Sequence, residues 1–297
     1  MFDRIVLVDQ STFTPAPTAV ASPDRPRAFI PIFSTKGFGK DDEVKLFEAY
    51  NHGTLVKNYG NPNILITLAP LYYAYEFLRG GGDVYIRRIV SATATHAHIV
   101  IVAKVRFPSE GANEGKAEVI FENRTLNSAT DLETMITDAE DLLNLTPDAD
   151  GFVVYPIAIT GVSWKGVEGN KYTIRLIPNT SLDKQIDQKA YTLEMRESVS
   201  SSPKSVGFTF DENATLDGQS IYANDIFEEQ SPNVFFNVLS TYSQFIEAIK
   251  DYIPEGEIGR PDIFFGRDKS GNIYPDYVIL NTSVDYTVSG GIAMQGG

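Results

Sequence analysis

The middle of this 297-residue chain carries a series of short apolar runs, and this series constrains the fold more than any other feature. The runs are rich in β-branched and aromatic residues and follow one another at spacings of roughly ten to twenty residues, which is typical of antiparallel strands joined by turns. Between residues 98 and 212 they are, in chain order, HIVIVAKVRF, KAEVIFE, GFVVYPIAI, NKYTIRLIP, KAYTLEMRE and VGFTFDE. We therefore predict an antiparallel β-rich middle.

Helical patterns accompany these strands. Pro70 suits the first turn of a helix that runs to about Leu78, and the glycines at 80–82 end this helix before a strand over 83–90. Three more helices are expected: one capped by Asp41 or Asp42 with Val44, Phe47 and Tyr50 facing inward, an acidic one over 131–145, and one opened by the capping pair Thr241 and Gln244. Together with the strands, these patterns predict a multi-domain α+β fold.

The N-terminal residues differ from the rest of the chain. Residues 5–8 form an apolar run that predicts a strand, and the prolines at 15, 17, 23 and 26 predict an extended spacer, because proline fixes φ and has no amide proton. We predict three parts: an extended arm over 1–24 that exchanges with a neighbouring subunit, an αβ core formed by 25–95 plus 255–297, and an inserted antiparallel β-rich outer domain over 96–254.

Charge and residue usage exclude several classes of protein. The chain has 25 Lys and Arg against 39 Asp and Glu, a net charge of −14, which disfavours nucleic-acid binding because that affinity depends on cations that neutralise phosphates. The absence of cysteine excludes disulfides, thiolate zinc sites and cysteine nucleophiles. We find neither a signal peptide nor a long apolar run, so we expect assembly in the cytoplasm and no stable membrane insertion.

The sequence offers little for catalysis. His96 and His98 are expected to form a surface pair on a strand, because no third metal ligand can be identified. The glycines at 80–82 follow a helix instead of opening one, so they predict a helix end and not a phosphate loop. Asp148 begins a string like that of a calcium loop, but the twelfth position is Ile159, so we predict a turn. We expect no catalytic, cofactor or metal site.

One stretch is more specific than these patterns. The YGNP string at 59–62, the YYAYEFLRGGG string at 72–82 and the VYIRRI string at 84–89 resemble the N-terminal part of contractile tail sheath proteins. Those proteins form the outer sleeve of phage tails and of related injection machines. The preceding FIPIFSTKGFGKDDEVKLF is similar to the family's strand, glycine loop and helix lead-in, and weaker similarity continues through segments 169–174, 191–195, 218–232 and 289–291.

The resemblance covers most of the chain. It does not include the helical and strand-bearing C-terminal domain of full sheath subunits, so we expect either a partial subunit, with its αβ sheath core incomplete at the C-terminus, or a short variant.

The resemblance implies a structural virion protein of the tail, not an enzyme and without a cofactor. It would form stacked hexameric rings in a helical assembly around the tail tube, and its contraction would drive the tube through the host envelope for genome ejection. The implied partners are other copies of the chain, the tail tube protein, and the baseplate and tail terminator proteins, without direct nucleic-acid contact.

An alternative remains open from the residues alone. The 15 Tyr and 18 Phe are compatible with a tail-associated carbohydrate-binding or glycan-hydrolysing protein. For the sheath hypothesis, the candidate structural and assembly residues are Ile5, Val6, Leu7, Val8, Tyr59, Gly60, Asn61, Pro62, Phe77, Leu78, Gly80, Gly81, Gly82, Tyr85 and Arg87.

Overall fold

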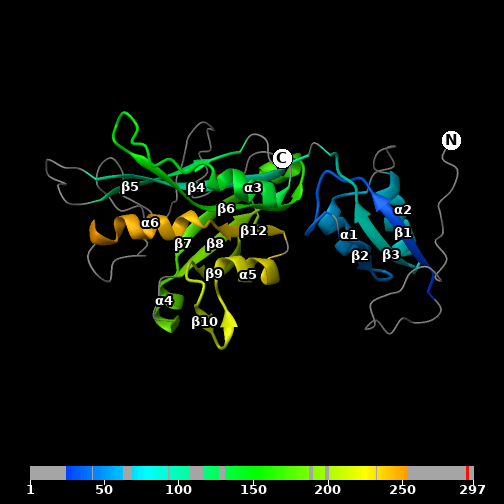
Figure 1. Cartoon of the computed structure of the whole chain (residues 1–297). Coiled ribbons are helices and arrows are strands. Elements are labelled where there is room, and N and C mark those ends of the chain that lie inside the picture. Colours follow the sequence, from blue (N-terminus) through cyan, green and yellow to red (C-terminus); the bar gives the residue numbers. More distant parts are fainter. Residues whose placement is uncertain are drawn as a thin grey trace. The chain divides into compact units, whose positions relative to one another are not determined.

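The computed structural model divides the chain into two compact units, Met1–Ala92 and Thr93–Gly297, which we describe separately (Figure 1). The residues that the structure describes are 25–41, 43–62, 69–92, 94–107, 117–126, 131–186, 190–197, 201–231, 233–252 and 292–293. Helices and several antiparallel sheets occur together, so the predicted α+β class is confirmed.

The first unit is a three-stranded sheet with two helices on one face. Its elements are β1 (Arg27–Ile32), β2 (Lys45–Phe47), α1 (His52–Tyr59), α2 (Ala69–Arg79) and β3 (Asp83–Arg88). The strand order is β1-β3-β2, with β1 parallel and β2 antiparallel to the central β3. The predicted helix from Pro70 and the predicted strand from residue 83 are therefore confirmed.

Alternation along the strands decides which side chains enter the core of the first unit. The apolar residues at every second position of β3, Val84 and Ile86, are fully buried. Their partners in register point to the same side of the sheet, where both helices pack. The complete core is Ile32, Phe47, Leu55, Tyr59, Leu71, Ala74, Leu78, Val84 and Ile86.

The helix predicted after Asp41 or Asp42 is wrong. Residues 45–47 instead form β2, which pairs with β3, and the next helix begins only at His52. Of the three residues expected to face inward, only Phe47 is buried, whereas Val44 is 43% and Tyr50 is 68% exposed. The free edge of β3 offers backbone hydrogen-bonding partners to residues 45–47. In this strand, Phe47 is the side chain that fills the core.

The second unit is built on two four-stranded antiparallel sheets. One has the order β12-β6-β4-β5 and the other β13-β7-β8-β9. The strands are β4 (His96–Arg106), β5 (Glu118–Arg124), β6 (Val153–Lys165), β7 (Thr173–Pro178), β8 (Ala190–Arg196), β9 (Lys204–Thr209), β12 (Val234–Val238) and β13 (Ile292–Ala293). Each of the six apolar runs contributes to one of these strands, which confirms the β-rich middle.

The helices and short elements of the second unit lie between these strands. They are α3 (Leu132–Glu140), η2 (Val167–Lys171), α4 (Thr180–Ile186), the hairpin β10 (Thr215–Leu216) and β11 (Gln219–Ser220), α5 (Ala223–Gln230), α6 (Thr241–Ile249) and η3 (Lys250–Tyr252). The acidic helix predicted over 131–145 is present as α3, shorter than expected, and Asp131 caps it by accepting the amide of Thr134 at 2.9 Å.

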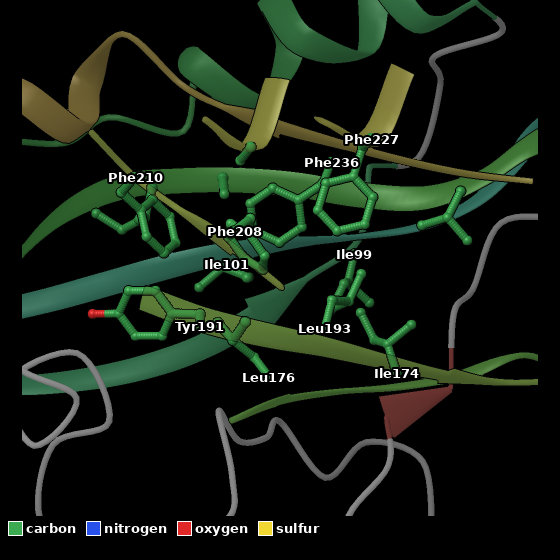
Figure 2. Packing of buried hydrophobic residues seen from close by; sticks show 14 of the residues in the cluster. Ile99, Ile101, Ile174, Leu176, Tyr191, Leu193, Phe208, Phe210, Phe227 and Phe236 are labelled. Carbon is green, nitrogen blue, oxygen red and sulfur yellow. The ribbon is translucent and has the colours of Figure 1, made fainter. Parts of the chain in front are cut away.

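The two sheets share one apolar core, in which 10 of the 30 buried residues are aromatic. Figure 2 shows side chains from β4, β7, β8 and β12 meeting those of α5 and the end of β9. Phe208 lies at the centre, fully buried, with the ring centroids of Phe227 and Phe236 at 5.3 and 4.8 Å. The other face of the β4–β6 sheet packs on α3 through Met135 and Ala139. Both faces of this sheet are thus covered, which explains the long uninterrupted burial along β4 and β6.

The predicted capping pair at the start of α6 is also wrong. Thr241 is the first helical residue instead of the cap, and the cap residue Ser240 makes no side-chain bond to the helix. The buried Thr241 hydroxyl donates to the carbonyl of Pro156, at a bulge where β6 shifts register against β4. The Thr241 hydroxyl therefore donates to a buried carbonyl of β6, instead of accepting a backbone amide in the first turn of α6 as a capping box requires.

The predicted domain boundaries stay a prediction. Residues 1–24 and 253–291 lie outside the described residues, so neither the arm nor most of the segment 255–297 can be placed. The two residues described there form β13, whose partner is β7 in the second unit.

Candidate functional site

The candidate residues of the first unit follow its two helices and its central strand. Ile5, Val6, Leu7 and Val8 lie outside the described residues. Those that remain divide into a group that shapes the core side of the sheet and a smaller group on the opposite side.

The turn after α1 anchors the first group. Tyr59 is buried, and its ring packs edge-on against Phe47 with a centroid distance of 6.0 Å. Burial, with a smaller contribution from Asp41, raises the pKa of Tyr59 to about 12. Gly60 has φ +88 and donates its amide to Val56 at 2.8 Å, which ends the helix. Asn61 is exposed and Pro62 half-buried.

The end of α2 is a double hydrogen-bonded helix stop. Gly82 donates its amide to the carbonyl of Phe77, and Gly81 donates to that of Leu78, both at 3.1 Å. These two bonds define a Schellman motif, whose penultimate residue must be left-handed. Gly81 meets this need with φ +89. The structure therefore has the helix stop that the sequence predicts, with no helix N-terminus at these amides.

Gly82 is also required by close packing, whereas a side chain on Gly81 would only have to displace the exposed Tyr50. A Cβ on Gly82 would lie 2.1 Å from Cε1 of Phe77, and a Cβ on Gly81 would lie 2.9 Å from the hydroxyl of Tyr50. Leu78 is fully buried, as predicted, whereas Phe77 is half-buried because its ring lies against the glycine turn. The turn thus fixes the direction in which the chain leaves α2 and enters β3.

The central strand β3 carries two arginines with opposite environments. Arg88 lies on the helix side and is 5% exposed, while Arg87 is exposed on the other side together with the half-buried Tyr85. The structure therefore separates Tyr85 and Arg87 from the glycine turn and Tyr59, with the sheet between the two groups.

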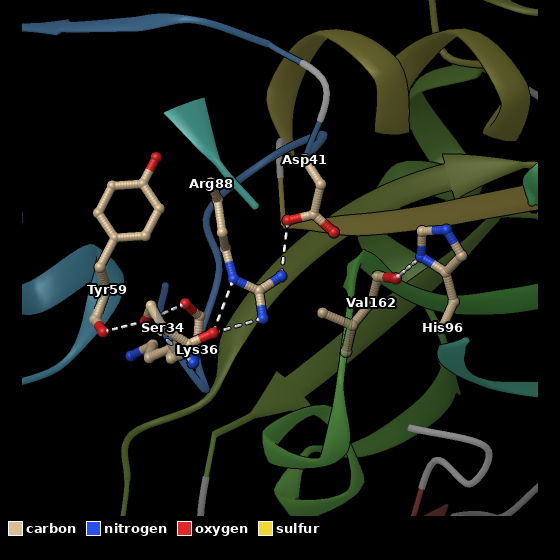
Figure 3. Close-up of polar contacts among 7 residues, drawn as sticks. All are labelled: Ser34, Lys36, Asp41, Tyr59, Arg88, His96 and Val162. Carbon is tan, nitrogen blue, oxygen red and sulfur yellow. Dashed lines mark hydrogen bonds and ion pairs between the residues drawn. The ribbon is translucent and has the colours of Figure 1, made fainter. Parts of the chain in front are cut away.

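Arg88 forms a buried polar centre that the sequence analysis missed (Figure 3). Its Nη1 donates to Asp41 at 2.7 Å, and its Nε and Nη2 donate to the carbonyl of Ser34 at 3.0 and 2.8 Å. The Ser34 hydroxyl in turn lies 2.5 Å from the carbonyl of Tyr59. The available signal was the alternation of β3: Arg88 falls in register with Val84 and Ile86, and an arginine at a core position needs a buried acceptor.

The prediction of a surface histidine pair in the second unit is wrong. Both rings are buried inside the β4–β6 sheet, and Nδ1 of His96 lies 2.9 Å from the carbonyl of Val162 (Figure 3). His98 accepts the amide of Leu126 at Nε2 and lies 2.8 Å from the carbonyl of His96 through Nδ1. This geometry requires the neutral ring with the proton on Nδ1, and burial lowers its pKa below 6.5.

The Asp148 turn is confirmed, because one carboxylate oxygen accepts the amides of Asp150 and Phe152 while the other pairs with Lys104 at 3.1 Å. The bond from Phe152 is the main reason why the pKa of Asp148 is lowered. In the part of the chain that the structure describes, no group of three or more metal-ligating side chains gathers, and no helix is long and apolar enough to span a membrane.

Comparison with known proteins adds only weak structural likeness. No protein-family model and no curated protein matches the sequence. Among solved structures, the chain is similar to the sheath tail protein of Desulfitobacterium hafniense, at 11% sequence identity and a TM-score of 0.28. The match covers 75% of this chain and 39% of that protein, so the chain spans less than half of its length. A TM-score this low carries neither fold nor function from one protein to the other.

Proposed function

We propose that this chain is a structural subunit of a contractile tail sheath. The observation that carries the proposal is the sequence resemblance over residues 59–89, from the glycine turn through the aromatic helix to the strand with Tyr85 and Arg87. The structure gives physical reasons for several of these residues, because Tyr59 fills the core, Gly81 has a left-handed backbone and Gly82 lies too close to the Phe77 ring for a side chain.

The function is mechanical. Copies of the chain assemble as hexameric rings around the tail tube, in contact with the tube, baseplate and tail terminator proteins, and the inserted domain over 96–254 points outward. Contraction is a rigid-body change between two packings of the same subunits, of which the contracted one has the lower free energy. The energy comes from subunit interfaces, so the chain needs no cofactor and no catalytic residue. The site of action is the virion tail.

Rigid units suit such a role. In the second unit, a core of interlocking rings resists deformation, because well-packed interiors have few alternative arrangements. In the first unit, the buried Arg88–Asp41 pair and the Schellman motif fix the connections between β1, α2 and β3. Movement between copies can then occur without movement inside either unit.

Antibody labelling of native particles tests the proposal. Antibodies raised against the purified chain are applied to tail-bearing particles released from cells that encode it, and gold-labelled secondary antibodies are located by electron microscopy. We expect label along the whole sleeve of extended and contracted tails. Label confined to fibre tips, with glycan binding by the purified chain, would favour the carbohydrate-binding alternative, and no label on any tail would reject both.

A further inference from the structure

The three-stranded sheet of the first unit has a second face that its helices do not cover. In register across β1, β3 and β2, the residues Phe29, Tyr85 and Leu46 form one row on this face. Pro31 and Arg87 form the next row. We call these five residues the open sheet face.

The open sheet face contributes nothing to the core of its own unit. That core draws on the alternate residues of the same strands, and neither Phe29, Tyr85 nor Leu46 belongs to it. Leu46 is 40% exposed, while Phe29 and Tyr85 are half-buried. A row of two aromatic rings and a leucine across a sheet is the type of surface that other proteins bury in an interface.

Arg87 adds a positive charge at the border of this apolar row. Its neighbour Arg88 is paired with Asp41, but within the described residues Arg87 has no ion-pair partner and is exposed. Arginine beside aromatic side chains is enriched at interfaces, because its guanidinium donates several hydrogen bonds to carboxylates.

The distribution of charge along the chain indicates which surface this face meets. Residues 25–92 contain 9 Lys and Arg against 6 Asp and Glu, whereas residues 93–297 contain 15 against 30. The net charge of −14 is therefore concentrated after residue 92, whereas the whole first unit, with 10 Lys and Arg against 9 Asp and Glu, is nearly neutral, and the positive charge at this face comes from Arg87. Surfaces of opposite charge attract at long range and are steered into contact.

We infer that the open sheet face docks on the acidic second unit of another copy of this chain. Because the two surfaces differ, the contact is heterologous, and repeating it produces rings or open filaments instead of closed dimers. Arg87 donates to carboxylates of the neighbouring second unit while the row of Phe29, Tyr85 and Leu46 is removed from water. The inference deepens the proposed function, since it places one surface of self-assembly, but it rests on charge and exposure and not on the sheath resemblance.

Site-specific photo-cross-linking tests the identity of the occupant. Leu46→p-benzoylphenylalanine places the probe on the open sheet face, and equal amounts of ¹⁴N- and ¹⁵N-labelled protein distinguish links between copies from links within one copy. We expect links between copies that end in residues 94–252. Links to residues 1–24, links only within the first unit, or no links between copies would overturn the inference.

A matched probe controls for random collision. Tyr73 on α2 is 51% exposed and belongs to the same unit, but it lies on a helix that covers the opposite side of the sheet. Tyr73→p-benzoylphenylalanine should give at most a few per cent of the links obtained from position 46. Equal yields from both positions would contradict a specific interface.

Charge reversal tests the contribution of Arg87. We expect Arg87→Glu to weaken self-association about tenfold in sedimentation velocity at low salt, and the wild-type association to weaken as salt is raised. The control is Lys57→Glu, at another exposed cation that has no ion-pair partner among the described residues, and it should leave association unchanged. Equal effects from both variants, or a wild-type chain that stays monomeric at every concentration, would overturn the inference.

These outcomes are separable from the proposed function. If antibodies label the sheath but the cross-links fail, the chain is a sheath subunit that assembles through other surfaces. If the cross-links succeed and the sheath is not labelled, the chain self-associates head to tail in a different assembly.

Discussion

The two units differ in how completely they bury their large apolar side chains. The second unit gathers its rings into one core, with Phe208, Tyr191 and Phe236 almost completely buried. The first unit leaves many such side chains in contact with water. Among the described residues, six large apolar side chains of the first unit are exposed, Phe33, Val44, Leu46, Tyr50, Tyr73 and Ile89, against two in the second, Ile120 and Leu145.

Size explains part of this difference, because a small unit has too little interior for all of its apolar residues. We attribute the rest of the difference in exposed apolar side chains to association with a partner. The acidic second unit buries nearly all of its large apolar side chains in its own core, whereas the small, nearly neutral first unit keeps an open sheet face on which we expect a partner to dock. The comparison teaches that apolar burial is more complete in the second unit, while the proposed docking surface lies in the first.

The largest loss of stability is expected from removing the aromatic ring at the centre of the second unit's core. Phe208→Ala deletes a fully buried side chain that contacts several others and leaves a cavity. We expect the free energy of unfolding of the second unit to fall by about 3–5 kcal/mol. Urea denaturation followed by circular dichroism measures this loss.

An exposed ring in the first unit provides the matched control. Phe33 is 46% exposed, so Phe33→Ala should change the unfolding free energy by no more than about 0.5 kcal/mol. Similar losses from both substitutions would show that the contrast between the two units is wrong.

The buried ion pair of Arg88 and Asp41 tests whether the stability of the first unit depends on a polar interaction as well as on its apolar core. The side chains of Arg88 and Asp41 are 4% and 11% exposed, so Arg88→Met leaves a carboxylate buried without its cation. We expect a loss of about 3 kcal/mol in the stability of the first unit. The double variant Arg88→Met with Asp41→Leu should recover most of it, because both charges are then gone.

Arg87→Met is the neighbouring control, on the open sheet face. It should leave monomer stability unchanged within about 0.5 kcal/mol while weakening self-association. A stability loss equal to that of Arg88→Met would mean that Arg87 belongs to the fold and not to an interface.

A substitution in the glycine turn should have a smaller effect on stability, and its control substitution should stabilise the protein. Gly81→Val puts a β-branched residue at φ +89 and against the Tyr50 hydroxyl, so we expect a loss of about 1–2 kcal/mol. Gly53→Ala in α1 meets nothing within 4 Å, so we expect a gain of up to about 1 kcal/mol from better helix propensity. Thermal melts of both variants measure the pair, and a stable Gly81→Val variant would contradict the architectural role of the turn.

The smallest expected effect is a pH dependence of the second unit. His98 is neutral in the folded chain, because burial lowers its pKa below 6.5, whereas the unfolded chain takes up a proton near pH 6.5. Since the unfolded state then binds more protons, stability is constant above pH 6.5 and falls as the pH drops from there toward the lowered native pKa. In His98→Gln, which keeps an acceptor for the Leu126 amide, this component of the slope should vanish. Unfolding free energies between pH 5 and 8 measure it, and parallel curves for the two proteins would contradict the assignment.

Much of the fold follows from local patterns in the sequence. The helix after Pro70, the glycine stop and the β-rich middle each depend on residues close together in the chain, namely the prolines, the glycines and the alternation of apolar side chains. The helix expected at Val44 to Tyr50 failed because residues 45–47 pair with β3, about forty residues away, and a local spacing of apolar residues cannot reveal such a partner.

The polar interior could not be predicted in the same way. His98 meets Leu126, Thr241 meets Pro156 and Arg88 meets Asp41 only after the sheets have formed. Each of these pairs joins residues far apart in sequence, and no spacing rule identifies the partner. The open sheet face has the same origin, because Leu46 and Phe29 become neighbours of Tyr85 only through strand pairing.

The central claim is that this chain is a sheath subunit whose first unit carries a docking surface. A cryo-electron microscopy reconstruction of tails purified from the cells that encode the chain tests it most directly. The account predicts rings of this chain around a central tube, with Phe29, Tyr85, Leu46 and Arg87 buried against residues 94–252 of a neighbouring copy. A sleeve built from another protein, or a sleeve of this chain in which the open sheet face is bare to solvent, would contradict it.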